Sequence, residues 1–355
     1  MTAMGPIALF GSGETAPRVQ RVHRRVMEQL SSPVQAAIVE TPAGFEPNCE
    51  AVARKIGDYL EHRLRNFQPQ VSLIPARRRN TAFDPDDPAI AAPLFHANYL
   101  FMGPGSPTYA VRQLRDTFTW HALRLRQRQG AGVCFSSAAT LAISQYTVPV
   151  YEIYKVGEDL HWKEGLDFFG AFGISLVIVP HWDNRDGGES LDTSHCYIGT
   201  ERYDGLVAML PQAGMTILGI DENTGLVIRP EEGVCEVIGA GGVTVIRDGD
   251  EERFIAKREF PAHELGDWRL PPIALGIPDA VRAASDKAAA EVVRRAEEDA
   301  RGQAVPQDVT ALSQSREEAR QRRDWQKADQ IRGQILDRGW QVIDTPEGPV
   351  LEMAT

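Results

Sequence analysis

The stretch Gly130-Ala-Gly-Val-Cys-Phe-Ser-Ser-Ala-Ala-Thr140 predicts a short buried strand that turns sharply into a helix. Residues 132–135 are apolar or glycine and have the length of a buried strand, and the small residues after them can begin a helix. Two serines, Ser136 and Ser137, occupy the turn between the two elements. A serine on such a turn stands at the end of the strand, where the next backbone amide and the helix N-terminus can stabilise a negative charge. The stretch therefore predicts a strand–turn–helix unit that carries a reactive serine.

The same succession of elements precedes this stretch several times. Apolar runs predict strands, and the segments between them predict helices, at 6–10, 17–30, 36–40, 51–64, 70–74, 97–102 and 109–129. Repeated strand, turn and helix units are typical of a parallel sheet with helices on both faces. In such sheets the ligand binds at the carboxyl ends of the strands, where Gly11-Ser-Gly-Glu14 and Gly103-Pro-Gly-Ser106 follow two of the predicted strands.

The chain divides into three parts that differ in composition and in the pattern of predicted elements. Residues 1–272 hold the alternating elements, including a strand at 174–180, a polar loop at 181–188 and a predicted hairpin at 235–247. Residues 273–306 form a linker and a long helix rich in Ala, Glu, Arg and Lys. Residues 307–355 predict two helices and a small hairpin.

Composition excludes several classes of protein. The chain has 355 residues, 43% of them hydrophobic, and a net charge of −11, so the whole chain should not attract nucleic acid or anionic membrane non-specifically. It contains no apolar run of membrane-spanning length, and its start lacks the basic region of a secretion signal. The four cysteines are widely spaced, which favours reduced thiols in the cytoplasm over disulfides or a metal site. We expect a cytoplasmic protein with no metal, no cofactor and no membrane partner.

Five motifs resemble the peptidase S51 family, which includes dipeptidase E and cyanophycinase, over roughly residues 6–246. They are the serine turn, Gly11–Glu14, Gly103–Ser106, His181-Trp-x-x-Arg185 with Arg202-Tyr-x-x-Leu206, and Gly219-Ile-Asp-Glu-Asn-Thr224. The resemblance implies an α/β fold, a flavodoxin-like, class I glutamine amidotransferase-like three-layer sandwich with a mostly parallel sheet, here followed by a small C-terminal helical appendage. It also implies a serine hydrolase that cleaves an amide or peptide bond next to an acidic residue in a small substrate.

The resemblance and the local sterics place the nucleophile on different serines. Aligning Gly130 with the glycine that opens the family strand makes Ser137 the nucleophile. Small residues two positions before and after suit a sharp turn better, and Ser136 has such flanks in Cys134 and Ala138. Phe135 and Ala139 stand where the family has glycines, and their Cβ atoms crowd the turn. Ser136 therefore remains the alternative nucleophile, and an inactive binding module on the same scaffold remains the alternative function.

The remaining site residues come from the matching motifs. His181 is the expected base because it follows a strand in a polar loop, and His195 is a weaker rival. Glu152 is the expected acid, with Glu158 and Asp159 as alternatives. The residues expected to bind the oxyanion or the substrate are Gly105, Ser106, Ala138, Glu14, Arg185 and Arg202, the two arginines through a substrate carboxylate.

The segment at 312–350 resembles the C-terminal end of cysteinyl-tRNA synthetase, a small helical module that contributes to tRNA recognition in that enzyme. Its arginines and lysine alternate with Glu317, Glu318, Asp324 and Asp329, a pattern typical of a solvated helical hairpin with local ion pairs. We therefore favour docking of this hairpin on the core or on a second subunit of a homodimer. Binding of tRNA or RNA through residues 312–350 is the alternative.

Overall fold

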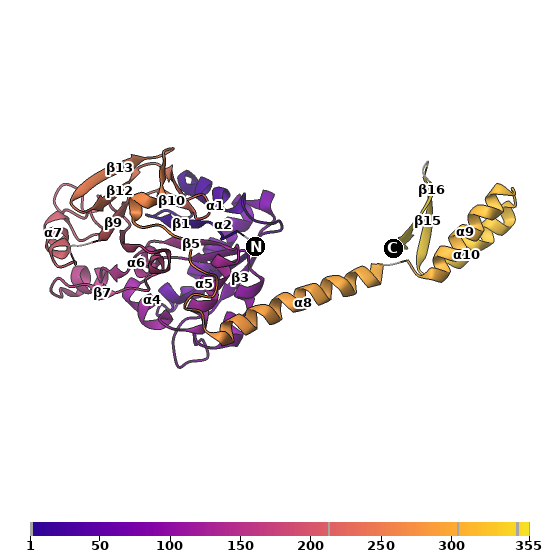
Figure 1. The fold of residues 1–355 in the computed structure, drawn as a ribbon, viewed down its shortest axis with the longest axis horizontal. Helices are drawn as coiled ribbons and strands as arrows, with labels where there is room; N and C mark the ends of the chain where they lie inside the picture. The colour runs from indigo at the N-terminus through magenta and orange to yellow at the C-terminus, as the bar shows by residue number, and fades with distance from the viewer. Residues whose placement is uncertain (1–2, 212–213, 304, 346–347, 355) are drawn as a thin grey trace. The chain divides into compact units, whose positions relative to one another are not determined.

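The computed structural model describes residues 3–211, 214–303, 305–345 and 348–354, and for residues 297–303 it describes the backbone alone. The chain forms two compact units, Met1–Asp286 and Lys287–Thr355. An eight-stranded sheet in the order β14-β11-β10-β1-β5-β4-β2-β3 forms the centre of the first unit (Figure 1). Five of its strands are parallel: β1 (Ile7–Phe10), β2 (Gln35–Val39), β3 (Gln70–Ile74), β4 (Tyr99–Met102) and β5 (Gly132–Ser136). Three join antiparallel beside β1: β10 (Thr224–Arg229), β11 (Val234–Gly239) and β14 (Glu259–Pro261).

Alternating apolar residues on these strands bury both faces of the sheet. On β1, Ala8 and Phe10 pack with α1 (Gln20–Met27) and α2 (Cys49–Arg63) on one face. Ile7 and Leu9 belong to the larger core on the other face. The elements contributing to that side are α3 (Pro88–Ala91), α4 (Pro107–Leu114), α5 (Phe118–Arg128) and α6 (Ala138–Ala142). The layered α/β architecture with a mostly parallel central sheet is thus confirmed.

A second sheet, in the order β13-β12-β9-β8, packs into the same larger core and was not predicted. Its parallel pair comprises β8 (Ser175–Val179) and β9 (Met215–Ile220), with Val179 level with Gly219. The other two strands of this sheet are β12 (Gly242–Arg247) and β13 (Asp250–Ile255). The same unit also contains a short ribbon of β6 (Tyr146–Thr147) and β7 (Lys163–Glu164), and helix α7 (Thr200–Ala208).

Two predicted elements were wrong in outline. The single helix expected over 109–129 is broken into α4 and α5, because Asp116 takes a φ of 58° and the Thr117 side chain then caps α5 by accepting from the Trp120 amide. The hairpin expected over 235–247 does not form, because β11 pairs with β10 whereas β12 pairs with β9 in the other sheet. The glycines at 239–242 carry the chain from one sheet to the other.

The second unit has a small core of its own. Helix α8 (Asp279–Gln303) begins in the first unit and runs into the second, which also contains α9 (Gln307–Gln321), α10 (Trp325–Leu336) and the hairpin of β15 (Trp340–Thr345) and β16 (Gly348–Met353). Val309, Ile331, Ile335 and Trp340 are buried together there. The two terminal nitrogens of the buried Arg316 guanidinium, Nη1 and Nη2, donate to the two Asp344 carboxylate oxygens at 2.9 Å each. In the described parts of both units, no helix is long and apolar enough to cross a membrane.

Candidate active site

The site forms where strand ends of the two sheets meet. β1 and β5 are parallel neighbours in the large sheet, with Phe10 level with Ser136. β8 and β9 are parallel neighbours in the small sheet, so the residues that follow them emerge side by side. A backbone hydrogen bond of 3.2 Å from the His181 amide to the Gly11 carbonyl joins the two sheets at this edge. The turns after β5, β8 and β9 therefore deliver their side chains to one place.

Ser137 occupies the turn between β5 and α6 with strained backbone angles, φ 52° and ψ −112°. A positive φ is unfavourable for a residue with a Cβ and persists where the surroundings enforce it, as at strained serine turns. Its neighbours are held firmly, because the Thr140 hydroxyl donates to the Phe10 and Phe135 carbonyls at 3.2 and 2.8 Å. The turn thus presents the Ser137 hydroxyl at the end of the strand.

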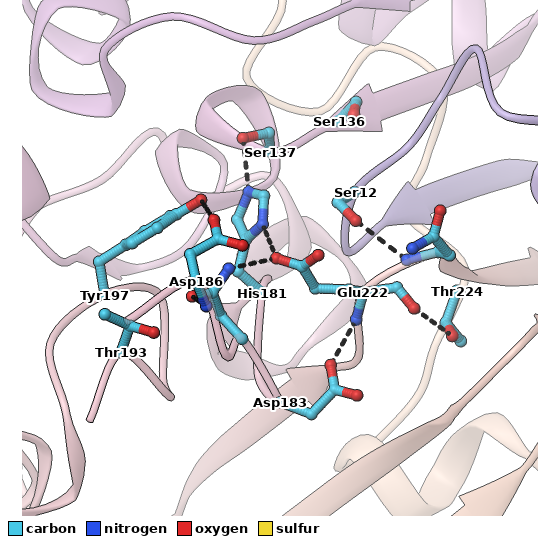
Figure 2. A network of polar contacts seen from close by, with 12 residues as sticks. Ser12, Ser136, Ser137, His181, Asp183, Asp186, Thr193, Tyr197, Glu222 and Thr224 are labelled. Atoms are coloured by element: carbon cyan, nitrogen blue, oxygen red, sulfur yellow. Dashed lines mark hydrogen bonds and ion pairs between the residues drawn. The ribbon is translucent and has the colours of Figure 1, made fainter. Parts of the chain in front are cut away.

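Ser137, His181 and Glu222 form a hydrogen-bonded chain (Figure 2). The Ser137 Oγ lies 2.9 Å from His181 Nε2, and His181 Nδ1 lies 3.0 Å from Glu222 Oε1. The same Glu222 oxygen accepts a hydrogen bond of 2.5 Å from the Asn184 side chain. The Glu222 amide donates to Asp183 at 2.7 Å, which fixes the turn after β9.

The partners of His181 determine which of its nitrogens carries the proton. An ionised carboxylate only accepts hydrogen bonds, so Nδ1 is the donor toward Glu222 and Nε2 can accept from the Ser137 hydroxyl. The hydrogen bond from His181 holds the pKa of Glu222 below its usual value, although partial burial opposes this, and Asn184 adds to the effect. Glu222 therefore stays ionised, and a serine, a histidine and a carboxylate stand in the order that general-base activation requires.

The expected acid, Glu152, lies elsewhere. Its Oε1 accepts a hydrogen bond of 2.6 Å from the Thr108 hydroxyl, and it contributes to a neighbouring cavity rather than to His181. The alternative Glu158 is near His161, at 3.7 Å. Sequence patterns did not bring Glu222 forward, although it belongs to the segment 219–224 that carries part of the resemblance. The position of Glu222 after an apolar strand, like that of His181, was the signal that could have found it.

Ser136 and Glu14 form a separate contact. Ser136 is fully buried, and its hydroxyl donates to Glu14 at 2.8 Å rather than to a histidine. Ser136 does not line the cavity at His181, whereas Ser137 does. The structure therefore places the hydroxyl of Ser137, and not that of the alternative Ser136, beside His181 and the cavity, while Glu14 is a partner of Ser136.

The bulky flanks of the turn are accommodated in the core. Phe135 is fully buried and packs edge-on against Phe168, with ring centroids 5.3 Å apart. Ala139 is fully buried in the same cluster, and neither residue lines the cavity at Ser137. The Cβ atoms that depart from the family pattern are thus absorbed by packing while Ser137 keeps its strained conformation.

The residues expected to bind an oxyanion differ in their surroundings. Gly105, at φ 144°, and Ala138, the first residue of α6, both line the Ser137 cavity. The amide of a first helical residue has no partner within the helix, so that of Ala138 can face a ligand. Ser106 does not fit the role, because its amide donates to the Pro42 carbonyl at 2.9 Å and its hydroxyl caps α4.

The cavity beside Ser137 has a volume of about 290 Å³ and is lined mainly by apolar and aromatic side chains. Lys155 lines it, with its ammonium 4.7 Å from the centre of the Tyr154 ring. The two arginines expected here do not line it: Arg185 is exposed, next to the inward-facing Asn184, and Arg202 contacts the Tyr197 carbonyl at 3.5 Å. The sequence pattern gave no signal for Lys155, which reaches the cavity from a short π-helix, Glu152–Val156.

The rival base His195 and the thiol of Cys196 are both poorly suited to the reaction. The His195 ring stacks on Tyr203 with centroids 4.2 Å apart, and burial lowers its pKa, so it belongs to an aromatic cluster. Cys196 lines the cavity, but burial raises the pKa of its thiol to about 12 and keeps it protonated. Among the described residues, no three His, Cys, Asp or Glu side chains gather into a group that could hold a metal ion.

Comparison with solved structures gives a structural neighbour that covers most of the chain. A peptidase from an acI-B1 actinobacterium has 19% sequence identity, with a TM-score of 0.58 over 73% of this chain and 97% of that chain. The two proteins share a fold. The sequence matches no family profile.

A short stretch is similar to curated cysteine–tRNA ligases. It is 46% identical to the Rubrobacter xylanophilus enzyme over 47 residues and 50% identical to a Burkholderia lata enzyme over 44 residues. The matched stretches make up 13% and 12% of this chain. They make up 10% and 9% of the two enzymes, so this chain spans only about a tenth of the length of either enzyme. The similarity supports the resemblance drawn for the C-terminal segment.

Proposed function

We propose that the first unit is a serine hydrolase that cleaves an amide or peptide bond next to an acidic residue. The observation that carries the proposal is the chain of hydrogen bonds from Ser137 through His181 to Glu222. In the proposed reaction, His181 Nε2 takes the hydroxyl proton as Ser137 Oγ attacks the carbonyl carbon, and Glu222 stabilises the imidazolium that forms. The amides of Gly105 and Ala138 are the proposed donors to the oxyanion.

The second half of the reaction completes the hydrolysis. The imidazolium of His181 gives its proton to the leaving nitrogen as the carbon–nitrogen bond breaks, which leaves an ester on Ser137. A water molecule, deprotonated by His181, then attacks the ester, and the Ser137 oxygen recovers the proton as the acid is released. For selection of an acidic side chain we propose Lys155, since it is a cation that lines the cavity at Ser137.

The decisive test is labelling with a fluorophosphonate followed by peptide mapping. We expect label on Ser137 in the native protein and in the Ser136→Ala variant, and none in Ser137→Ala. Label on Ser136, or equal labelling in all three folded proteins, would contradict the assignment. Absence of label from every folded protein would favour the binding module on the same scaffold.

The similarity to cysteine–tRNA ligases supports a second candidate function, RNA binding by the C-terminal segment. Asp344 already engages Arg316 and Arg320, whereas Arg323, Lys327 and Arg332 are exposed. We propose that these three cations contact phosphates, and that Arg323→Gln with Lys327→Gln weakens tRNA binding and flattens its salt dependence. Salt-independent or unchanged binding would exclude this role.

A further inference from the structure

A second, larger cavity adjoins the one at Ser137. Its volume is about 850 Å³, compared with about 290 Å³ for the smaller one. The turn 105–108 separates them, because Gly105 and Pro107 line the smaller cavity while Ser106 and Thr108 line the larger. Tyr151 lines both cavities. A substrate seated at Ser137 that extends past Tyr151 therefore enters the larger cavity.

Two arginines line the larger cavity. Arg78 and Arg112 both line it and are exposed, and the Arg112 guanidinium lies 5.2 Å from the centre of the Tyr109 ring. The Tyr109 hydroxyl donates to the carbonyl of Arg77, the residue before Arg78, at 2.9 Å, so the backbone that carries Arg78 also lies at this ring. Within the described part of the chain, no carboxylate pairs with either arginine, whereas the adjacent Arg77 pairs with Glu40 and Glu50.

Two carboxylates, Glu46 and Glu152, line the same cavity, and Glu152 follows directly on Tyr151, which borders both cavities. Glu152 Oε1 accepts from Thr108, but its Oε2 is buried and has no hydrogen-bond partner among the described residues. A buried carboxylate oxygen without a donor is unfavourable, so a donor from a ligand would stabilise it.

The charged groups that line the larger cavity, two cations and two carboxylates, complement the charged groups of the part of a short peptide that hydrolysis releases. Beyond a carbonyl at Ser137 come the nitrogen of the cleaved bond, which hydrolysis turns into an ammonium, and then the terminal carboxylate. We infer that the larger cavity is a subsite for the leaving group, in which Arg78 and Arg112 bind the free carboxylate terminus of a short peptide while Glu152 and Glu46 face its nitrogen. The role of this subsite in holding a leaving group rests on the proposed function. The binding of a carboxylate by Arg78 and Arg112 does not rest on it.

Binding to an inactive variant tests the subsite without relying on turnover. Calorimetry on the full-length Ser137→Ala protein would compare aspartyl-phenylalanine with its C-terminal amide. Because guanidinium groups bind carboxylates through charge-assisted hydrogen bonds, we expect the free acid to bind at least roughly ten-fold more tightly. When Arg78→Gln and Arg112→Gln are added to the Ser137→Ala protein, we expect the acid and the amide to bind with equal affinity. Arg185 lies outside both cavities, so Arg185→Gln is the control and should leave the difference in affinity unchanged.

Each outcome separates this inference from the proposed function. Equal binding of acid and amide, no measurable binding of either, or a preference that survives loss of both arginines would overturn the subsite. A preference that depends on Arg78 and Arg112 would support it even if the native protein hydrolyses neither peptide, and in that case the proposed hydrolase would fail alone. Hydrolysis of both peptides by the native protein at the same kcat/KM would refute the subsite and leave the hydrolase standing.

Discussion

At the scale of single residues, the site depends on strained backbone conformations in three turns. Ser137, His181 and Asn223, the residue after Glu222, have φ values of 52°, 52° and 53°. Each left-handed residue with a Cβ costs on the order of 1–2 kcal/mol. The surrounding hydrogen bonds hold these conformations, such as that of 2.9 Å from the Asn223 amide to the Ser12 hydroxyl. Each strained turn aims a side chain at the same point.

Glu222→Gln should impair the reaction far more than its size suggests. An uncharged amide does not stabilise the imidazolium, and its NH2 group can donate to Nδ1 and so favour the wrong tautomer; the equivalent change in a serine triad lowers kcat by roughly 10⁴-fold. The rate of fluorophosphonate labelling and the hydrolysis of aspartyl peptides would measure the loss. Glu158→Gln is the matched control and should leave both rates unchanged, because Glu158 lies near His161 and not near His181. Equal effects of the two changes would argue against the role of Glu222.

His23 should make the stability of the protein depend on pH. It is fully buried, with Nε2 donating to the Glu14 carbonyl at 2.7 Å and Nδ1 2.5 Å from the Tyr99 hydroxyl, and burial lowers its pKa from 6.5 to about 4. Between these values the unfolded chain binds a proton that the folded chain excludes, so the free energy of unfolding falls as pH falls from about 7 to 4. The shift corresponds to about 3 kcal/mol.

Urea unfolding at several pH values would measure this term. The His23→Gln variant cannot titrate at this position, so its free energy of unfolding should decline by about 3 kcal/mol less than that of the native protein over the same interval. Parallel curves for the two proteins would show that His23 does not contribute.

Ser137 and His181, which the sequence brings forward, lie within hydrogen-bonding distance in the structure, whereas Glu152, the expected acid, accepts from Thr108 and not from His181. Glu152 and Glu222 are both acidic residues near strands or turns, and the sequence offers no measure of their distance from His181. That distance depends on the pairing of β8 with β9, which places the turn after one strand beside the turn after the other.

At the scale of elements, the turn from β4 to α4 shows how closely backbone segments pack at the site. A Cβ added to Gly105 would lie 2.0 Å from the Pro42 carbonyl oxygen, and its φ of 144° suits only glycine. The Ser106 amide donates to that same carbonyl, so the turn is tied to the segment after β2. The amide of Gly105 is thereby held at the edge of the Ser137 cavity.

Gly105→Ala should displace this turn and weaken both stability and labelling. Because the clash is with backbone, we expect a loss of about 1–3 kcal/mol in the free energy of unfolding and slower labelling of Ser137. Gly188→Ala is the matched control: its φ is 65°, but a Cβ there meets nothing within 4 Å, so only the backbone term of about 1 kcal/mol should appear. Thermal melts and labelling rates of the two variants provide the comparison, and similar labelling rates would contradict a role for the Gly105 turn.

The boundary between α4 and α5 could have been predicted from the sequence. Thr117 is a favoured capping residue, and it follows Asp116, which tolerates a left-handed backbone. The sequence did not show that β11 and β12 belong to different sheets. Both are short apolar strands joined by a glycine-rich segment, and a hairpin has the same pattern.

At the scale of the whole molecule, the proposed chemistry belongs to one unit. Ser137, His181, Glu222 and the residues lining both cavities lie within Met1–Asp286. The second unit has its own core around Ile335 and Trp340, together with the Arg316–Asp344 pair. A separate core indicates that the second unit does not depend on the first for its internal packing.

Removal of the residues after Gln303 should therefore leave the site working. We expect the shortened protein to label at Ser137 at the same rate as the full chain, because no residue of the proposed site is lost. If RNA binding is present in the full chain, it should disappear with these residues, as the exposed cations of α10 go with them. A shortened protein that stays folded but no longer labels would show that the second unit contributes to the site.

Local patterns in the sequence predict the layered α/β fold, the strand–turn–helix unit at 130–140 and the helical C-terminal segment, because hydrophobic periodicity and glycine turns are local properties. The contacts of the folded chain were needed to show that Glu222 is the carboxylate beside His181, that Ser137 rather than Ser136 contacts this histidine, and that Lys155, Arg78 and Arg112 line the cavities. Those outcomes depend on strand pairing between distant segments and on a second sheet that packs into the same core. Contacts of this kind are set by the packing of the whole unit, and residue type or spacing along the chain does not encode them in a readable form.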